Sequence, residues 1–115
     1  MAFLFENLDV YQKSIQLADE ITDLTETFPK GKYYLKDQLN RAIISIGNNI
    51  AEGNERWHKG DKRNFFFIAR GSAAECVPLL EICKRKKLLD ENKHIEYKKR
   101  IEDICKMLSG LINKV

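Results

Sequence analysis

Apolar residues recur at intervals of three and four along most of the chain, which is the spacing of one face of an α-helix. This pattern predicts helices over about residues 8–28, 35–52, 61–87 and 90–115. Pro29 and Gly31 end the first segment, and Gly53 is a suitable C-terminal cap for the second. No segment alternates with a period of two for long enough to predict a strand. The chain is therefore predicted to be all-α.

The connections between the predicted helices are short, so consecutive helices should lie antiparallel to one another. The predicted architecture is an antiparallel up-down-up-down four-helix bundle, formed by one domain that spans residues 1–115. Asp61 is the expected N-cap of the third helix. Pro78 lies inside that helix, where it should interrupt the hydrogen-bond ladder and cause a kink.

Two of the predicted helices are more apolar than a single bundle requires. Residues 42–51 of the second helix carry no charge, and the third helix has apolar residues on two nearly opposite faces. The face of the third helix predicted to point inward consists of Phe65, Ile68, Ser72, Cys76, Leu79 and Cys83, and that of the first helix consists of Tyr11, Ile15, Ala18, Ile21, Leu24 and Phe28.

A helix that is apolar on two sides is buried on two sides, so the second stripe predicts a homo-oligomer. A thick core within one subunit is the alternative. The predicted interface between subunits consists of Ile44, Gly47, Ala51, Phe67, Gly71, Ala74 and Pro78.

A few polar residues interrupt these uncharged helices, and they should be hydrogen-bonded or paired because an unsatisfied buried charge is costly. We expect Arg70 to pair with Glu52 or Glu75. Contacts with a ligand or an RNA are the alternative role. The predicted network consists of Arg41, Asn49, Glu52, Arg70, Ser72 and Glu75.

Short sequence blocks spread over about residues 5–112 resemble one known family. They are Phe5-Glu6-Asn7-Leu8 with Tyr11 and Gln12, Arg41-Ala42 with Ser45-Ile46, Asn49-Ile50-Ala51-Glu52-Gly53 with Arg56, Phe65 to Ile68 running into Ala69-Arg70-Gly71-Ser72 with Glu75, and Leu80-Glu81-Ile82 with Lys84. Together they resemble the small bacterial proteins encoded in intervening sequences of large-subunit ribosomal RNA genes, also called ribosomal-protein-S23-like. The blocks Asn49 to Gly53 and Ala69 to Ser72 are the most specific.

The resemblance implies an antiparallel four-helix bundle that assembles as a ring-like homopentamer. A more distant similarity to the accessory proteins of diversity-generating retroelements implies nucleic acid and a reverse transcriptase as partners of those relatives. For the intervening-sequence proteins themselves the resemblance implies a fold and no established activity.

Cysteine and histidine residues offer little chemistry in this pattern. The three cysteines, Cys76, Cys83 and Cys105, form no Cys-x-x-Cys motif and lie on apolar helix stripes, where a thiol acts as a small hydrophobe. Two Glu-x-x-His pairs, Glu55 with His58 and Glu91 with His94, are typical of di-iron bundles, but the third helix should hold them about 37 Å apart. We expect no metal and no cofactor.

Basic residues gather at the predicted helix ends, and the excess positive charge falls after residue 34. Lysine and arginine can neutralise phosphates, and Trp57 could stack on an unpaired base. Cations that complement helix dipoles or keep the surface soluble are the competing explanation. The candidate nucleic-acid-binding residues are Arg56, Trp57, Lys59, Lys62, Arg63, Lys84, Arg85, Lys86, Lys87, Lys98, Lys99 and Arg100, with His58 beside the first group.

Several classes of protein are disfavoured by what the sequence lacks. It has no apolar run long enough for a membrane helix, and its first residues do not resemble a signal peptide, so we expect a cytoplasmic protein. No nucleophile–base pair, poised carboxylate dyad or glycine-rich phosphate loop stands out, so no catalytic residue is predicted. The predicted function is a non-enzymatic, oligomeric protein that binds RNA or DNA without strong sequence preference. A scaffold or regulatory subunit that docks another protein is the alternative.

Overall fold

The computed structural model describes residues 3–115, and these residues form four α-helices, two short 3₁₀ helices and no strand. The predicted all-α class is therefore confirmed. The elements are η1 (Leu4–Asn7), α1 (Asp9–Thr25), η2 (Lys30–Lys32), α2 (Tyr33–Glu55), α3 (Lys59–Arg85) and α4 (Glu91–Lys114).

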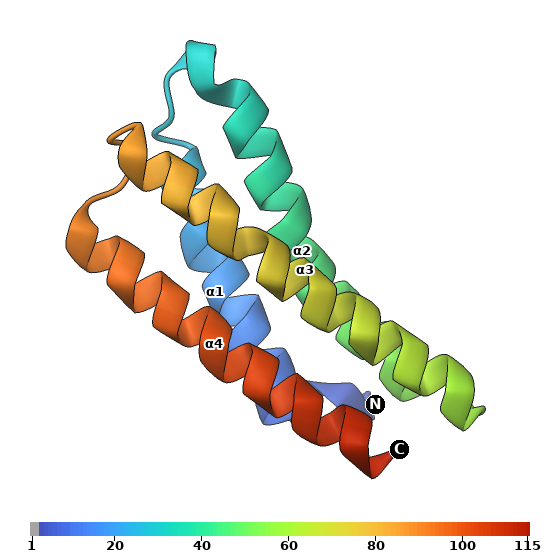
Figure 1. Ribbon diagram of the computed structural model, residues 1–115. Helices are drawn as coiled ribbons and strands as arrows, with labels where there is room; N and C mark the ends of the chain where they lie inside the picture. Colours follow the sequence, from blue (N-terminus) through green and yellow to red (C-terminus); the bar gives the residue numbers. More distant parts are fainter. Residues whose placement is uncertain (1–2) are drawn as a thin grey trace.

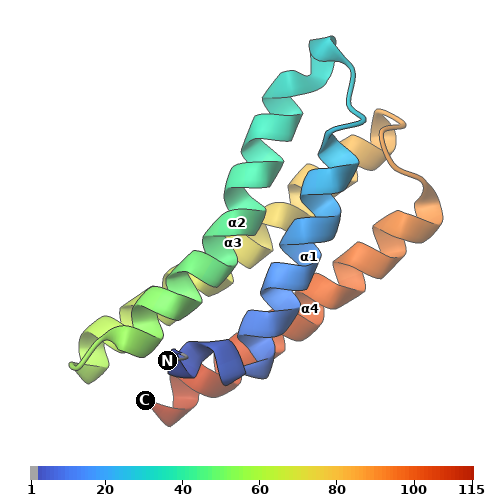
Figure 2. The same cartoon turned by 180° about the vertical axis from the view of Figure 1, so that it is seen from behind.

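The connections between helices divide between the two ends of the molecule. The α1–α2 and α3–α4 connections lie at one end, here called the two-turn end, and the α2–α3 connection lies at the other (Figure 1). Viewed from behind, the connection between α2 and α3 lies at the same end of the molecule as the two chain ends, and it is called the tip and defined here as residues 56–60 (Figure 2). The molecule measures 43 × 26 × 20 Å along its principal axes.

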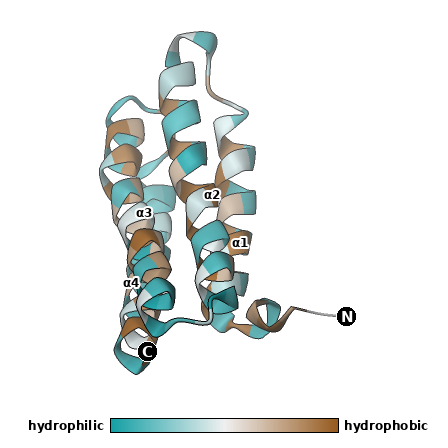
Figure 3. Cartoon of the chain, turned by 90° about the vertical axis from the view of Figure 1, so that its right-hand side faces the viewer, coloured by the Kyte–Doolittle hydropathy of each residue, from teal (hydrophilic) through white to brown (hydrophobic). Residues whose placement is uncertain are grey.

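The helices pack around one hydrophobic core to which each contributes a buried face. Hydrophobic and hydrophilic positions alternate along the ribbon in the manner of amphipathic helices (Figure 3). The fully buried side chains include Leu17, Ile21, Leu39, Ile46, Ile50, Leu80, Ile101, Ile104 and Leu108. Among the described residues, no helix is long and apolar enough to cross a membrane.

Two predicted inward faces are rotated in the structure. Ile15 is 45% exposed, and Val10, Ser14 and Leu17 take the buried positions of α1. In α3 the helix buries Phe66, Ala69, Ala73 and Leu80 beside the predicted Cys76, Leu79 and Cys83, whereas Ile68 is 43% exposed. The small side chains of Ala69 and Ala73 bring α3 close to its neighbours, which is why this side faces the core.

The predicted N-cap of the third helix is wrong. The α3 helix begins at Lys59, with His58 in the N-cap position, so Asp61 lies in the first turn instead of capping it. An acidic side chain in the first turn still complements the helix dipole. The helix is continuous through Pro78, whose ring is exposed, although proline has no N–H to donate to the carbonyl four residues earlier.

Gly53 does not cap α2 as predicted, because the helix continues to Glu55 and no described glycine has a positive φ. Gly53 is buried, and a Cβ atom placed there would lie 2.8 Å from Cε1 of Phe66 and 3.1 Å from Cβ of Phe65. The C-terminus of α2 is capped instead by Lys62, whose Nζ donates to the carbonyls of Gly53 (3.1 Å) and Asn54 (2.9 Å). Gly53 therefore permits the close approach of α2 and α3.

Gly53→Ala should destabilise the protein although alanine favours helices. Overpacking a core costs about 1–3 kcal/mol, which exceeds the helix-propensity gain of about 1 kcal/mol. Gly110→Ala is the matched control, because a Cβ there meets no atom within 4 Å and the substitution should stabilise α4 by about 0.5–1 kcal/mol. Urea denaturation should show a lower free energy of unfolding for Gly53→Ala and a higher one for Gly110→Ala than for the wild type. Equal stabilisation of both variants would contradict the packing role of Gly53.

Candidate nucleic-acid interface

The tip carries the most exposed large aromatic side chain among the described residues. Trp57 is 96% exposed, and every residue from position 55 to 61 is exposed. Arg56 stands immediately before it, with its guanidinium 4.6 Å from the Phe65 ring centroid and its Nη2 3.0 Å from Oε2 of Glu52. The tip therefore presents an exposed indole in the sequence between a paired arginine and the start of α3.

The other cations predicted at this end have different structural roles. Lys62 caps α2, and Nη2 of Arg63 donates to the Val115 carbonyl at 2.6 Å, which joins the start of α3 to the end of α4. Lys59 is exposed and makes no ion pair within residues 3–115. Of the predicted nucleic-acid-binding residues, three lie in the tip itself and are exposed to solvent: Arg56, Trp57 and Lys59.

The run of cations from Lys84 to Lys87 divides into paired and unpaired halves. Lys84 lies 3.6 Å from Glu81 and 3.9 Å from Glu91, and Arg85 donates to Glu81 at 2.9 Å. Lys86 and Lys87 are exposed, and no ion pair involves them within the described part of the chain. The backbone amide of Leu88 donates to the Cys83 carbonyl at 2.9 Å while Lys87 adopts a left-handed φ of 62°. This hydrogen bond is that of a Schellman motif, which ends α3 with Lys87 at its exposed corner.

The third cationic group lies on the side of the molecule and is mostly engaged. Nη1 and Nη2 of Arg100 donate to the two carboxylate oxygens of Glu20 at 2.9 and 2.7 Å, and Nη1 also donates to Glu96 at 3.1 Å. Lys99 pairs with Asp103 at 3.1 Å, and Lys98 is exposed. Arg100 therefore joins α4 to α1 and does not extend the basic surface of the two-turn end.

Glu20→Gln should lower stability at neutral pH and reduce the loss of stability in acid. The hydrogen bond from Arg100 lowers the pKa of Glu20, so the pair contributes fully above the ordinary carboxyl pKa and is lost as the pH falls through the lowered value. The loss should be about 1 kcal/mol or less, because the side chains of Arg100 and Glu20 are 27% and 34% exposed. Urea denaturation at neutral and acidic pH measures it. A gap between wild type and variant that does not shrink in acid would contradict the pairing.

The predicted polar network is present only in part. The hydroxyls of Ser45 and Ser72 lie 2.9 Å apart, and the Asn49 amide donates to the Ser45 carbonyl (2.8 Å) and hydroxyl (2.9 Å), which links α2 to α3. Glu52 pairs with Arg56 instead of Arg70. The remaining members are exposed and make no ion pair within residues 3–115: Arg41, Arg70 and Glu75. Their charges are solvated, so the physical reason for pairing them does not apply.

The predicted subunit interface lies mostly on the surface of the single chain. Ile44 and Phe67 are 46% and 48% exposed, and the uncharged outer face of α3 continues over Gly71, Ala74 and Pro78, all exposed. Ala51 is half-buried. Gly47 differs from the others, because it is buried and a Cβ there would lie 2.9 Å from Cδ1 of Ile15. Gly47 therefore belongs to the contact between α1 and α2.

The cysteines have the properties of core residues. Burial raises the pKa of Cys76 to about 12 and that of Cys83 to about 11, and both are fully buried. Burial also raises the pKa of the half-buried Cys105, against the smaller opposing effect of Arg70. All three thiols are thus protonated at neutral pH. No group of three or more potential metal ligands occurs among residues 3–115, and Glu91 lies near Lys84 while His94 is buried 3.7 Å from Glu81.

One exposed aromatic and basic segment was missed by the sequence analysis. Lys30, Lys32, Tyr33 and Tyr34 lie at the start of α2, and the two tyrosines are 46% and 52% exposed. The signal was available in the run Lys-Gly-Lys-Tyr-Tyr, which follows Pro29 directly and lies between two predicted helices.

Comparison with known proteins gives the chain a family. The model of the family described as 23S rRNA-intervening sequence protein matches residues 6–110. The chain belongs to this family. The resemblance carried by its sequence blocks is therefore confirmed.

A solved structure extends the likeness to the fold. It is the crystal structure of a protein with unknown function from the S23 ribosomal protein family from Bacteroides thetaiotaomicron. It superposes on this member of the intervening-sequence family with a TM-score of 0.84 at 26% identity, over 90% of this chain and 97% of that one. The comparison with curated proteins gave no match.

Proposed function

We propose that this intervening-sequence protein is a cytoplasmic, non-enzymatic protein that binds RNA or DNA without strong sequence preference through the ends of an antiparallel up-down-up-down bundle. The observation that carries the proposal is the tip, where Trp57 is 96% exposed beside Arg56 and Lys59. The proposal rests on the chemistry of these side chains, since neither the family nor the related crystal structure indicates an activity.

An indole that projects into water contributes nothing to the core of its own chain. Such a ring offers two faces on which unpaired bases of any sequence can stack, and neighbouring cations supply the contacts to phosphates. Arg56 is held by Glu52 and by the Phe65 ring, so it keeps a defined place next to the indole. This combination favours nucleic acid over a purely solvated surface.

We propose further that the protein is a homo-oligomer joined through the outer face of α3, as a ring-like pentamer by analogy with the resembled family. The support within this chain is the uncharged stripe of Phe67, Gly71, Ala74 and Pro78. A ring would repeat each basic end, and weak contacts would then add by multivalency. The same exposed stripe favours the second candidate function, a scaffold that docks another protein.

The proposal is tested by the salt dependence of binding to mixed-sequence RNA and DNA. Affinity should fall steeply with salt, because each neutralised phosphate releases about 0.7 counterions on single strands and about 0.9 on duplex. Replacing Lys84, Arg85, Lys86 and Lys87 together by glutamine should reduce the slope of the logarithm of affinity against the logarithm of salt concentration. Because Lys84 and Arg85 already pair with Glu81, most of the change should come from Lys86 and Lys87.

Two lysines outside the candidate basic clusters provide the control. Lys13→Gln with Lys106→Gln removes exposed charges from α1 and α4 and should leave the slope nearly unchanged. Absence of binding by the wild-type protein at about 50 mM salt, where nonspecific electrostatic binding is strong, would rule out the proposal and leave the scaffold.

A further inference from the structure

We propose that the two-turn end holds a second binding surface for single-stranded nucleic acid, in which Tyr33 and Tyr34 stack on bases and Lys30, Lys32, Lys86 and Lys87 contact phosphates. This inference rests on the proposed function, because it takes nucleic acid as the ligand. It goes further in specifying single strands and a second binding surface on the molecule. It does not depend on Trp57, which lies at the opposite end of the molecule (Figure 1).

The segment that presents the tyrosines is a short, well-anchored turn. Phe28 is 4% exposed and holds the end of the preceding segment in the core, and η2 follows with the Lys32 amide donating to the Pro29 carbonyl at 2.8 Å. The chain then enters α2 at once, so the rings stand on the first turn of a long helix. The tyrosines are therefore exposed on a rigid element.

Lys36 fixes the orientation of one of the two rings. Its Nζ lies 5.4 Å from the Tyr33 ring centroid and 3.3 Å from Oε1 of Glu26, and its side chain is 23% exposed. The ammonium group is thus held at the ring by a carboxylate from the end of α1. Tyr33 remains 46% exposed, which leaves room for a base to stack on it.

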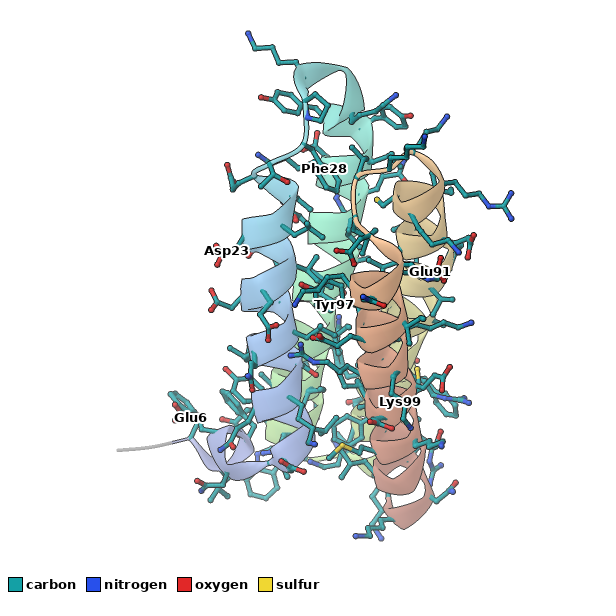
Figure 4. All side chains as sticks on the ribbon, turned by 90° about the vertical axis from the view of Figure 1, so that its left-hand side faces the viewer. Glu6, Asp23, Phe28, Glu91, Tyr97 and Lys99 are labelled. Atoms are coloured by element: carbon teal, nitrogen blue, oxygen red, sulfur yellow. The ribbon has the colours of Figure 1, made fainter. Side chains whose placement is uncertain are left out.

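The two connections lie at the same end of the molecule (Figure 1). Leu24, near the end of α1, lines the same open depression as Lys87 and Leu88 of the α3–α4 connection. Side chains of Phe28 in the α1–α2 connection and Glu91 at the start of α4 mark the two turns at the same end of the molecule (Figure 4). The lysines of η2 and those that end α3 therefore lie at the same end of the molecule (Figure 1).

The charge that remains uncompensated at this end is positive. Among the described residues, Lys30, Lys32, Lys86 and Lys87 make no ion pair. The nearby acidic groups are largely engaged: Glu26 pairs with Lys36, Glu91 lies near Lys84, and the Asp90 carboxylate accepts from the Lys93 amide at 2.7 Å as the N-cap of α4. Asp23 near the end of α1 and Asp37 on the next turn of α2 are exposed and make no ion pair within residues 3–115, so they are the two acidic groups that four unpaired lysines outnumber.

Two aromatic rings with unpaired cations distinguish single strands from other polyanions. A duplex encloses its base faces, and an acidic peptide would use the lysines without needing the rings. Stacking on an aromatic side chain is worth about 1–3 kcal/mol per base and tolerates any sequence. The surface therefore fits an unpaired stretch of RNA or DNA.

The test measures the binding of a short fluorescein-labelled oligothymidylate by anisotropy, in a Trp57→Leu background that removes the tip ring. In this background Tyr33→Leu with Tyr34→Leu should weaken binding by about thirtyfold or more, because two rings are lost and each stacked base is worth about 1–3 kcal/mol. Tyr33→Phe with Tyr34→Phe keeps the rings and should retain the affinity. Lys30→Gln with Lys32→Gln should lower the salt slope by about 0.7 per lost phosphate contact, and the control Lys13→Gln with Lys106→Gln should not.

The outcomes separate this inference from the proposed function. If the leucine variants bind as the background does, or if the phenylalanine variants lose affinity equally, the tyrosine surface is overturned. If Trp57→Leu alone abolishes binding, the second surface is overturned and the proposed function stands. If the wild-type protein does not bind the oligonucleotide or mixed-sequence nucleic acid, both fall. Retained circular dichroism and melting temperature verify that these substitutions, all at exposed positions except the half-buried Lys32, leave the fold intact.

Discussion

Ala74→Glu is expected to convert the proposed oligomer into a monomer of 13.4 kDa. Ala74 is exposed in the single chain and stands at the middle of the uncharged stripe, one turn from Gly71 and from Pro78. If a second copy covers this stripe, the new carboxylate must leave water and its larger side chain must fit where a methyl group stood, and removing a charge from water costs several kcal/mol. Light scattering coupled to size-exclusion chromatography measures the mass.

The control for this prediction is a charge placed on another helix. Lys106→Glu reverses a charge on an exposed position of α4, outside the stripe, and should leave the assembled mass unchanged. Both positions are exposed in the single chain, so circular dichroism should show a helical fold in each variant. A wild-type protein that is monomeric at micromolar concentration would contradict self-association. An Ala74→Glu variant that keeps the oligomer mass would place the interface elsewhere.

The presence of the helices could be predicted because their apolar residues repeat with the helical period over many turns. The choice of the buried face of α3 could not. Phe65, Phe66 and Phe67 follow one another, so three directions about 100° apart each carry an aromatic ring. The structure buries Phe66, half-buries Phe65 and leaves Phe67 48% exposed. The buried face of α3 also contains Ala69 and Ala73, whose small side chains allow close packing of helices but add little hydrophobic signal to the sequence pattern.

Gly53 illustrates a second limit of sequence reasoning. A glycine near the end of an apolar pattern is typical of a left-handed helix cap, and a glycine against another helix gives the same local signal. Only the position of the Phe66 ring, 2.8 Å from the site of a Cβ, separates the two. That position depends on how α2 and α3 cross.

The candidate site shows the same division between local and long-range information. The clusters of cations and the single tryptophan are visible in the sequence, but the pairing of each cation is not. Arg100 is engaged by Glu20, which lies 80 residues away along the chain, and Lys62 is engaged by backbone carbonyls of the preceding helix. Folding therefore reduces a long list of candidate cations to a few that are exposed and unpaired, among them Lys59, Lys86 and Lys87.

Trp57→Ala is expected to weaken the binding of single-stranded nucleic acid by about five- to a hundredfold, since stacking is worth about 1–3 kcal/mol per base. Binding to duplex should change little, because the base faces of a duplex are already stacked. Anisotropy of a labelled single strand and of a labelled duplex measures the two affinities, and Trp57→Phe, which keeps a ring, is the matched control.

Trp57 also provides a direct signal, because it is the single tryptophan of the chain and its fluorescence should be quenched when a base stacks on it. Its side chain is 96% exposed, so Trp57→Ala should leave the melting temperature unchanged, and any loss of affinity can be assigned to the tip. The scaffold alternative predicts no quenching by nucleic acid. Equal losses for single strands and duplex would contradict stacking and indicate that the tip acts through its cations alone.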